Sequence, residues 1–473
     1  MKTRHLSIIA CAVLGLSFFP PFLTPALAQF ELRFTNTDFL IWSDAGPNHA
    51  YLVEHAPELA PAPANTTWTP TIANDHVPGV ALGAVVPPWA AADRGFYRVQ
   101  AIPRGTITAT AAVSSTSRFE MQLVFALAGV SITPDFGVDV IRMQYDTLDA
   151  RNQPTLASGI IAVPQGAAGA RPLASIQRPT ILREDEAPTA STTQQLQAAA
   201  LASLGYVVAL PDLLGFGDSS GIHPYVHTKA SATAVVDMLR ATRSWAATNG
   251  QALNDQLFLA GYSQGGHATM AAHRMLEEQH ADEFTVTASA PMAGPYDLSE
   301  TMFDLLEQPF DTPYYFPYLL FGYDEVYGFM TNDSDILQAP YDTTLRPLFN
   351  GQNGGGTINA AMPASTLPAD ILQPAYRAAL TADPNHPLRE LLRRNDLFDW
   401  TPMAPVRLIH CRGDTTVPNA NSTKAFATFI ANGAQNISTF TPDAAPASPL
   451  GHGDCALPAL LDAVNWFDGF LAP

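Results

Sequence analysis

Basic residues are scarce in this chain, cysteines are few, and long apolar runs are confined to its start. Lysine and arginine number 24 against 43 acidic residues, which gives a formal net charge of −19. Such an acidic surface argues against nucleic acid and anionic membranes as partners. After residue 28, no apolar run is long enough to span a bilayer. At 473 residues the chain is still long enough for two domains and a large core.

The N-terminus has the pattern of an export signal. Lys2 and Arg4 precede a largely apolar run, which ends in the small-residue sequence Ala26-Leu27-Ala28. We therefore expect residues 1–28 to be a signal peptide and the mature protein to be secreted, extracellular or periplasmic. Removing this segment also removes one of the three cysteines, Cys11.

One short motif carries most of the chemical information. An apolar run over residues 257–260 is followed by Gly261-Tyr262-Ser263-Gln264-Gly265 and then by a helix-forming stretch. A strand, a sharp turn and a helix around G-x-S-x-G form a nucleophile elbow, in which the glycines let strand and helix approach closely. The pattern predicts Ser263 as a nucleophile. The N–H of Gln264, at the start of the helix, is predicted as an oxyanion donor.

The same short pattern occurs a second time, around Ser219. Gly217-Asp218-Ser219-Ser220-Gly221 runs into a segment with no helix to receive it. We interpret this second match as a polar surface loop.

A serine nucleophile needs a base and an acid to orient that base, and in α/β hydrolases the chain order is serine, acid, histidine. A buried strand over residues 406–410 leads to a loop that carries Asp414, and a last strand near residues 437–440 leads to His452. This order predicts Asp414 as the acid and His452 as the base, with Asp454 as the alternative acid. His410 is interpreted as a core residue at the end of its strand.

The two cysteines outside the signal flank these residues. Cys411 lies three residues before Asp414, and Cys455 lies three residues after His452. If the acid and the base meet, their loops lie side by side, so we predict a disulfide between Cys411 and Cys455. Two buried free thiols are the alternative.

The chain divides into regions of different pattern. Residues 29–104 contain short β-type runs separated by proline, asparagine and glycine, which favours a small β-sandwich. This region resembles a fibronectin-like module. Residues 105–120 are predicted as a Thr-, Ala- and Ser-rich linker. Residues 121–473 alternate short apolar runs with helical stretches, which predicts an α/β domain.

An insertion interrupts the α/β pattern at about residues 297–400, where we expect a helical cap. Nine aromatic residues fall within 20 positions near its start. Cap domains lie over the mouth of the site. We expect Tyr314, Tyr315 and Phe316, together with Tyr262 beside the serine, to contact substrate.

From about residue 122 to residue 471 the sequence resembles the secretory lipase family of α/β hydrolases, which includes yeast lipase A-type enzymes and bacterial relatives. The resemblance lies in residues 261–266, in 211–219 with His223-Pro224-Tyr225, and in 294–299. It implies an α/β-hydrolase fold and a carboxylic-ester hydrolase that needs no metal or other cofactor.

One turn departs from the family pattern. The family usually has a Gln-His-Gly-Thr-like turn after the third strand, whereas this chain has Gln177-Arg178-Pro179-Thr180. Pro179 has no N–H to donate, so Thr180 is predicted as the second oxyanion donor.

These patterns together predict a secreted serine carboxylesterase or lipase. The expected substrates are small-molecule or polymeric esters with apolar or aromatic groups. Two alternatives remain: a serine peptidase on the same fold, and a non-catalytic polymer-binding protein. The sequence does not indicate an oligomeric state.

Overall fold

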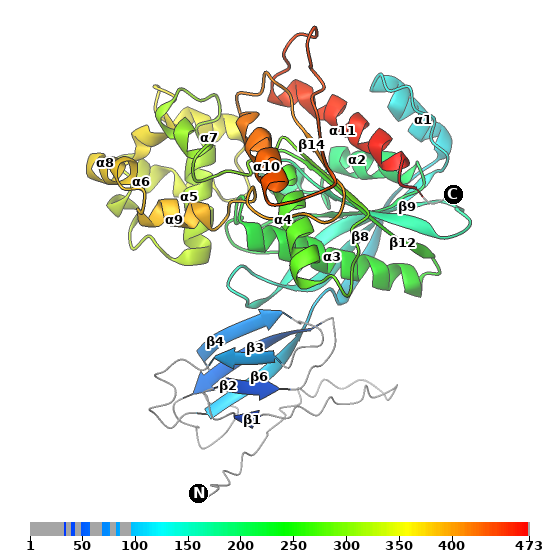
Figure 1. The fold of residues 1–473 in the computed structure, drawn as a ribbon, viewed down its shortest axis with the longest axis horizontal. Helices are drawn as coiled ribbons and strands as arrows, with labels where there is room; N and C mark the ends of the chain where they lie inside the picture. The colour runs from blue at the N-terminus through cyan, green and yellow to red at the C-terminus, as the bar shows by residue number, and fades with distance from the viewer. Residues whose placement is uncertain are drawn as a thin grey trace, which may run out of the picture. The chain divides into compact units, whose positions relative to one another are not determined.

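The computed structural model describes residues 33–34, 39–42, 49–56, 69–75, 82–85 and 96–471. The chain divides into two compact units, Met1–Ile102 and Pro103–Pro473 (Figure 1). The predicted signal peptide, residues 1–28, lies outside the described residues.

The described part of the N-terminal unit consists of two three-stranded sheets. One has the order β1-β2-β5 and the other the order β4-β3-β6. The strands are β1 (Arg33–Phe34), β2 (Phe39–Trp42), β3 (His49–Ala56), β4 (Thr69–Asp75), β5 (Leu82–Val85) and β6 (Phe96–Pro103). The short runs predicted as β-type fall on β2, β3, β4 and β6. The fibronectin-like identity of the unit stays a prediction.

The second unit is built on one nine-stranded sheet with the order β15-β14-β13-β12-β10-β11-β9-β8-β7. The strands are β7 (Ile107–Thr116), β8 (Val138–Leu148), β9 (Pro154–Pro164), β10 (Arg171–Gln177), β11 (Val207–Pro211), β12 (Leu253–Tyr262), β13 (Ala288–Met292), β14 (Val406–Ile409) and β15 (Ile437–Phe440). Strands β10 to β15 run parallel, while β7, β8 and β9 are antiparallel. The carboxyl ends of the parallel strands therefore meet along one edge, where ligands bind in such sheets.

Most of the segment predicted as a linker, residues 105–120, has regular structure instead. Residues 107–116 form β7, which pairs with β8, and α1 (Arg118–Leu127) follows at once. Ser117 and Glu120 form a capping box at the start of that helix, with the Ser117 N–H 2.7 Å from a Glu120 carboxylate oxygen. Most side chains of β7 are exposed, because the strand lies at the sheet edge and buries little of either face. A strand of this kind has a polar composition like that of a linker.

Helices cover both faces of the sheet. Helices α3 (Thr228–Thr248), α4 (Gln264–Gln279) and α10 (Ala420–Ala431) pack on one face, and α1, α2 (Thr192–Ala202) and α11 (His452–Asp468) on the other. Strand β12 serves both layers, because Leu257 and Leu259 belong to the first core and Phe258 and Ala260 to the second. Burial on both faces explains the continuous apolar runs of the parallel strands. Among the described residues, no helix is both long enough and apolar enough to cross a membrane.

A helical region lies between β13 and β14 and has its own hydrophobic core. Its helices are α5 (Tyr315–Tyr327), α6 (Tyr341–Thr344), α7 (Gly355–Ala361), α8 (Pro374–Ala382) and α9 (Pro387–Arg393). They gather at one end of the sheet, drawn green to orange in Figure 1. Phe321 and Tyr323 of α5 are fully buried there, so most of the aromatic cluster at the start of the insertion packs inside the cap.

Candidate active site

Ser263 sits in a strained turn between β12 and α4. Its φ is 61°, a left-handed backbone conformation that residues other than glycine seldom adopt. Its N–H donates to the Met292 carbonyl at 2.9 Å. A Cβ on Gly261 would collide with the Gly265 carbonyl, and a Cβ on Gly265 would collide with the Gln177 carbonyl. The two glycines therefore allow strand, turn and helix to pack at the distance that the elbow requires.

The structure brings the three predicted residues of the triad together. Ser263 Oγ lies 2.8 Å from His452 Nε2, and His452 Nδ1 lies 2.6 Å from Asp414 Oδ2. In the neutral ring, Ser263 donates to Nε2 and the Nδ1–H donates to the carboxylate. Ser263 and Asp414 are 6% and 5% exposed, so both hydrogen bonds lie where water competes little.

Asp414 accepts hydrogen bonds at both carboxylate oxygens. The N–H groups of Thr416 and Val417 donate to Oδ1 at 3.0 and 2.8 Å, and His410 Nε2 lies 3.2 Å from Oδ2. Burial alone would raise the pKa of Asp414, but the hydrogen bonds from His410 and His452 and the neighbouring imidazole charge lower it to about 2. Asp454, the alternative acid, is exposed in the first turn of α11.

His410 is buried, as expected, and it also contacts the acid. Its Nε2 faces two acceptors, the Val417 carbonyl at 2.8 Å and Asp414 Oδ2, so this nitrogen carries the proton. Its Nδ1 then accepts from the Ser422 hydroxyl at 2.7 Å. The sequence signal for this role was its position four residues before the acid.

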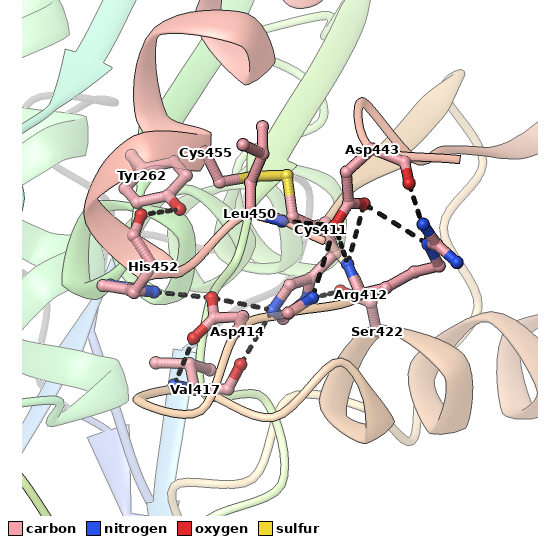
Figure 2. The surroundings of a disulfide bond; sticks show 12 residues. Tyr262, Cys411, Arg412, Asp414, Val417, Ser422, Asp443, Leu450, His452 and Cys455 are labelled. Atoms are coloured by element: carbon pink, nitrogen blue, oxygen red, sulfur yellow. Dashed lines mark hydrogen bonds and ion pairs between the residues drawn. A yellow bond between two sulfur atoms is a disulfide. The ribbon is translucent and has the colours of Figure 1, made fainter. Parts of the chain in front are cut away.

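The acid loop and the base loop are joined by a covalent bond and by hydrogen bonds (Figure 2). Cys411 and Cys455 form the predicted disulfide, with their Cα atoms 6.0 Å apart. The buried carboxylate of Asp443 accepts the N–H groups of Arg412 and Leu450, each at 2.8 Å. One carboxylate thus bonds to a residue on each loop. Sequence analysis did not identify Asp443, because nothing in the pattern shows which loop its side chain meets.

Beside Ser263 lies a narrow cavity of about 80 Å³ that opens to solvent. Its lining combines Ser263, Gln264 and Tyr225 with mostly apolar side chains from residues 295–319 and from the rest of the cap. Tyr315 and Phe316, at the start of α5, are among them. No group of three or more potential ligand side chains suited to a metal ion occurs in the part of the chain that the structure describes.

Two residues that we expected to contact substrate do not line this cavity. The Tyr262 hydroxyl donates to the His452 carbonyl at 2.6 Å, and its ring stacks obliquely beside the imidazole. Tyr314 packs edge-on against Tyr315. Contact of Tyr262 and Tyr314 with substrate stays a prediction.

The structure places Thr180 beside a residue that lines the cavity and Ser219 in a separate loop. Thr180 follows β10, and its hydroxyl lies 3.1 Å from the hydroxyl of Tyr225, which lines the cavity. Ser219 is outside the site, as predicted, but its side chain is buried. Its hydroxyl accepts the N–H of Gly215 at 3.0 Å within its own loop.

Comparison with known proteins shows which proteins this chain resembles. The secretory lipase family model matches residues 184–310. The rice cell wall degrading esterase LipA from Xanthomonas oryzae is 27% identical over 78% of this chain and 98% of its own, with a TM-score of 0.68. A candidate hydrolase from Legionella pneumophila is 25% identical over 77% of this chain and 98% of its own, with a TM-score of 0.71. No curated protein matches the chain.

Lipase A from Candida antarctica, in its closed state, matches 79% of this chain and 84% of its own at 16% identity and a TM-score of 0.56, a likeness of fold alone. The predicted fold class is thereby confirmed. The chain is an α/β hydrolase, and its matches support a place in the lipase family and an ester-hydrolysing activity.

Proposed function

We propose that this protein is a secreted serine carboxylic-ester hydrolase that acts through Ser263, His452 and Asp414 and forms an acyl-enzyme. One observation carries the proposal: the continuous hydrogen-bonded series from Ser263 Oγ through His452 to Asp414, beside an apolar cavity. The disulfide and the secretory family match support an exported protein.

In the acylation step, Ser263 Oγ attacks the ester carbonyl carbon while its proton moves to His452 Nε2. The imidazolium that forms is held by Asp414 through the Nδ1–H. As the tetrahedral intermediate collapses, His452 returns the proton to the departing alkoxide and the acyl-enzyme remains. Water then attacks by the same route, with His452 as the base, and releases the acid and free Ser263.

The oxyanion is proposed to be held by the N–H groups of Gln264 and Thr180. Gln264 is the first residue of α4, so its N–H lies at the positive end of that helix. Pro179 leaves Thr180 as the first residue after Arg178 that can donate from its main chain.

The cavity lining supports esters with an apolar or aromatic acyl group. Leu298, Met302 and Phe303 lie before the cap helix, and Phe316 and Leu319 lie on it. These side chains offer contact area but few hydrogen bonds, so chain length and shape should decide selectivity more than polar substituents.

A fluorophosphonate probe tests the nucleophile directly. We expect one label per folded chain, on Ser263, and none on the Ser263→Ala variant. The labelled preparation should lose hydrolysis of short, long and aromatic nitrophenyl esters in proportion. Labelling with faster cleavage of peptide anilides than of esters would favour the peptidase alternative. A folded chain that reacts with neither probe nor ester would overturn the proposal.

A further inference from the structure

A buried cation lies directly behind the proposed oxyanion donor. The Arg178 side chain is 1% exposed, and its guanidinium carbon lies 4.7 Å from the centre of the Phe216 ring. Its Nε donates to the Asp212 carbonyl at 2.9 Å and its Nη1 donates to the Gln264 side chain at 3.2 Å. The Arg178 side chain therefore touches the very residue whose main-chain N–H follows the nucleophile.

This guanidinium is only partly satisfied. Among the residues that the structure describes, Arg178 Nη2 has no hydrogen-bond partner, and Arg178 forms no ion pair with a carboxylate. The carboxylate of Asp212, whose carbonyl accepts from Arg178, is instead bonded to Ser158 and Thr189. Burial lowers the pKa of Arg178 to about 10, so the side chain still carries its charge at neutral pH. An unpaired buried charge is costly, which calls for a reason to keep it.

The contact with Gln264 has only one consistent assignment of donors. Arginine can only donate, so the Gln264 atom facing Arg178 is Oε1, and the Gln264 amide nitrogen faces His223 Nε2. His223 must then accept at Nε2 and carry its proton on Nδ1, which donates to the Leu214 carbonyl. The Gln264 side chain is clamped at both ends, by a cation on one side and by a neutral imidazole on the other.

The turn that carries Arg178 also packs against the helix that begins at Gln264. The carbonyls of Gln177 and Arg178 lie so close to Gly265 that a Cβ there would collide with both. Side-chain and main-chain contacts thus connect this turn to the first residues of α4. They restrain the orientation of the residue that offers the oxyanion donor.

We propose that Arg178 is a positioning residue of the oxyanion hole: it holds Gln264 in place, and its buried charge favours the negative oxygen of the transition state. The inference rests on the proposed function, since it assigns a role within that reaction. The charge acts through a low-dielectric interior, where fixed cations and dipoles are most effective. The proposed role of Arg178 concerns the turn at which Pro179 has no N–H to donate to the oxyanion.

The test compares Arg178→Met, which removes charge and donors, with Arg178→Lys, which keeps the charge but not the planar fork. Each variant is titrated with the fluorophosphonate to count competent serines, and kcat and KM for a nitrophenyl ester are expressed per labelled site. We expect kcat to fall about 100-fold in Arg178→Met and about 3- to 10-fold in Arg178→Lys, with KM changed less than about 3-fold, since only transition-state contacts are lost.

Arg104→Met is the matched control. Arg104 is equally buried but pairs with Asp237 at 2.7 Å outside the site, so this variant should lose thermal stability and keep its kcat per labelled site. A parental kcat in either Arg178 variant overturns the inference. If Arg178→Met does not fold, Arg178→Lys decides: a lower kcat at constant KM supports the inference and a parental kcat overturns it. Failure of the proposed function would look different, because the folded parent itself would then react with neither the probe nor the ester.

Discussion

The two sides of the site are held by different physical means. On the side of the acid and the base, the loops are joined by a disulfide and by the buried carboxylate of Asp443, and Asp414 collects four hydrogen bonds. On the side of the oxyanion, the contacts run through a guanidinium, an amide and a neutral imidazole. The first side must keep an anion beside the imidazolium that forms, and the second must receive an anion that exists only during the reaction.

This difference separates permanent charge from transient charge. A permanent carboxylate is stabilised by donors present in the resting protein, which is why the pKa of Asp414 lies at about 2. A transient oxyanion needs donors and positive charge that are in place before the reaction, and the buried guanidinium of Arg178, which bonds to the Gln264 side chain, is proposed to supply such a charge. The predictions that follow disturb one side at a time.

The largest effect is expected on the acid side, from Asp414→Asn. The amide keeps the shape but cannot hold His452 in the tautomer that accepts from Ser263, so kcat should fall by about 10⁴-fold. Steady-state hydrolysis of a nitrophenyl ester measures this loss. Asp454→Asn is the control and should keep parental activity. If Asp454→Asn is the inactive variant instead, the acid has been assigned wrongly.

Lowering the pH should reduce the stability of the fold, and His223 on the oxyanion side should contribute to this loss before Asp414 does. Burial, with the nearby charge of Arg178, lowers the pKa of His223 from its ordinary 6.5 to about 3. Between these two values the unfolded chain binds a proton that the folded chain does not, so stability is full above pH 6.5 and is lost as the pH falls. The loss is about 1.4 kcal/mol per pH unit for this group. The buried His227 and His267, with pKa values of about 3 and 4, act in the same direction.

Urea unfolding at pH 7 and at pH 4.5 measures this loss. His223→Gln is the matched variant, because glutamine can accept from Gln264 and donate to Leu214 without titrating. Its stability should depend less on pH than that of the parent. An equal pH dependence in both proteins would show that His223 does not contribute.

Removing the disulfide should disturb the side of the site that carries the acid and the base. Cys411 and Cys455 are separated by 44 positions, for which loop-closure entropy gives about 4 kcal/mol as an upper figure. The Cys411→Ser, Cys455→Ser variant should therefore unfold at lower urea concentration and show a lower kcat, since the acid and base loops are less restrained. A variant with parental kcat but lower stability would restrict the disulfide to a structural role.

The smallest effect is expected from Asp443→Asn. The amide oxygen can still accept from one loop, but its NH₂ group cannot accept from the other, so roughly 1–2 kcal/mol of stability should be lost. Activity should fall a few-fold. Combined with the loss of the disulfide, the two effects should exceed their sum, because both features join the same pair of loops. Strict additivity in a double-mutant cycle would contradict that coupling.

The sequence could predict those parts of the site that depend on local pattern or on chain order. The elbow at Ser263 follows from glycine spacing between a strand and a helix. Asp414 and His452 follow from their order after two strands, and the disulfide follows from the positions of two cysteines relative to them. These features need no knowledge of which distant side chains meet.

The features that were missed depend on tertiary contacts or on exposure. Strand β7 reads as a linker because an edge strand buries little and keeps polar side chains. Asp443 gains its role only when the loop after β15 meets the loop after β14. His410 gains its role only when its own loop folds back and brings the Asp414 carboxylate to the imidazole. The hydrogen bond from the Tyr262 hydroxyl to the His452 carbonyl likewise joins residues that lie 190 positions apart.

The position of the disulfide has a consequence for the timing of activity. Thiols stay reduced inside a cell, so a chain that has not reached an oxidising compartment would join its acid and base loops through hydrogen bonds and no covalent bond. If the protein is exported as proposed, the acid and base loops would be fully restrained only after export, and the cell that makes the chain would hold it in the less restrained form. The covalent bond between Cys411 and Cys455 would then act as a maturation step as well as a support.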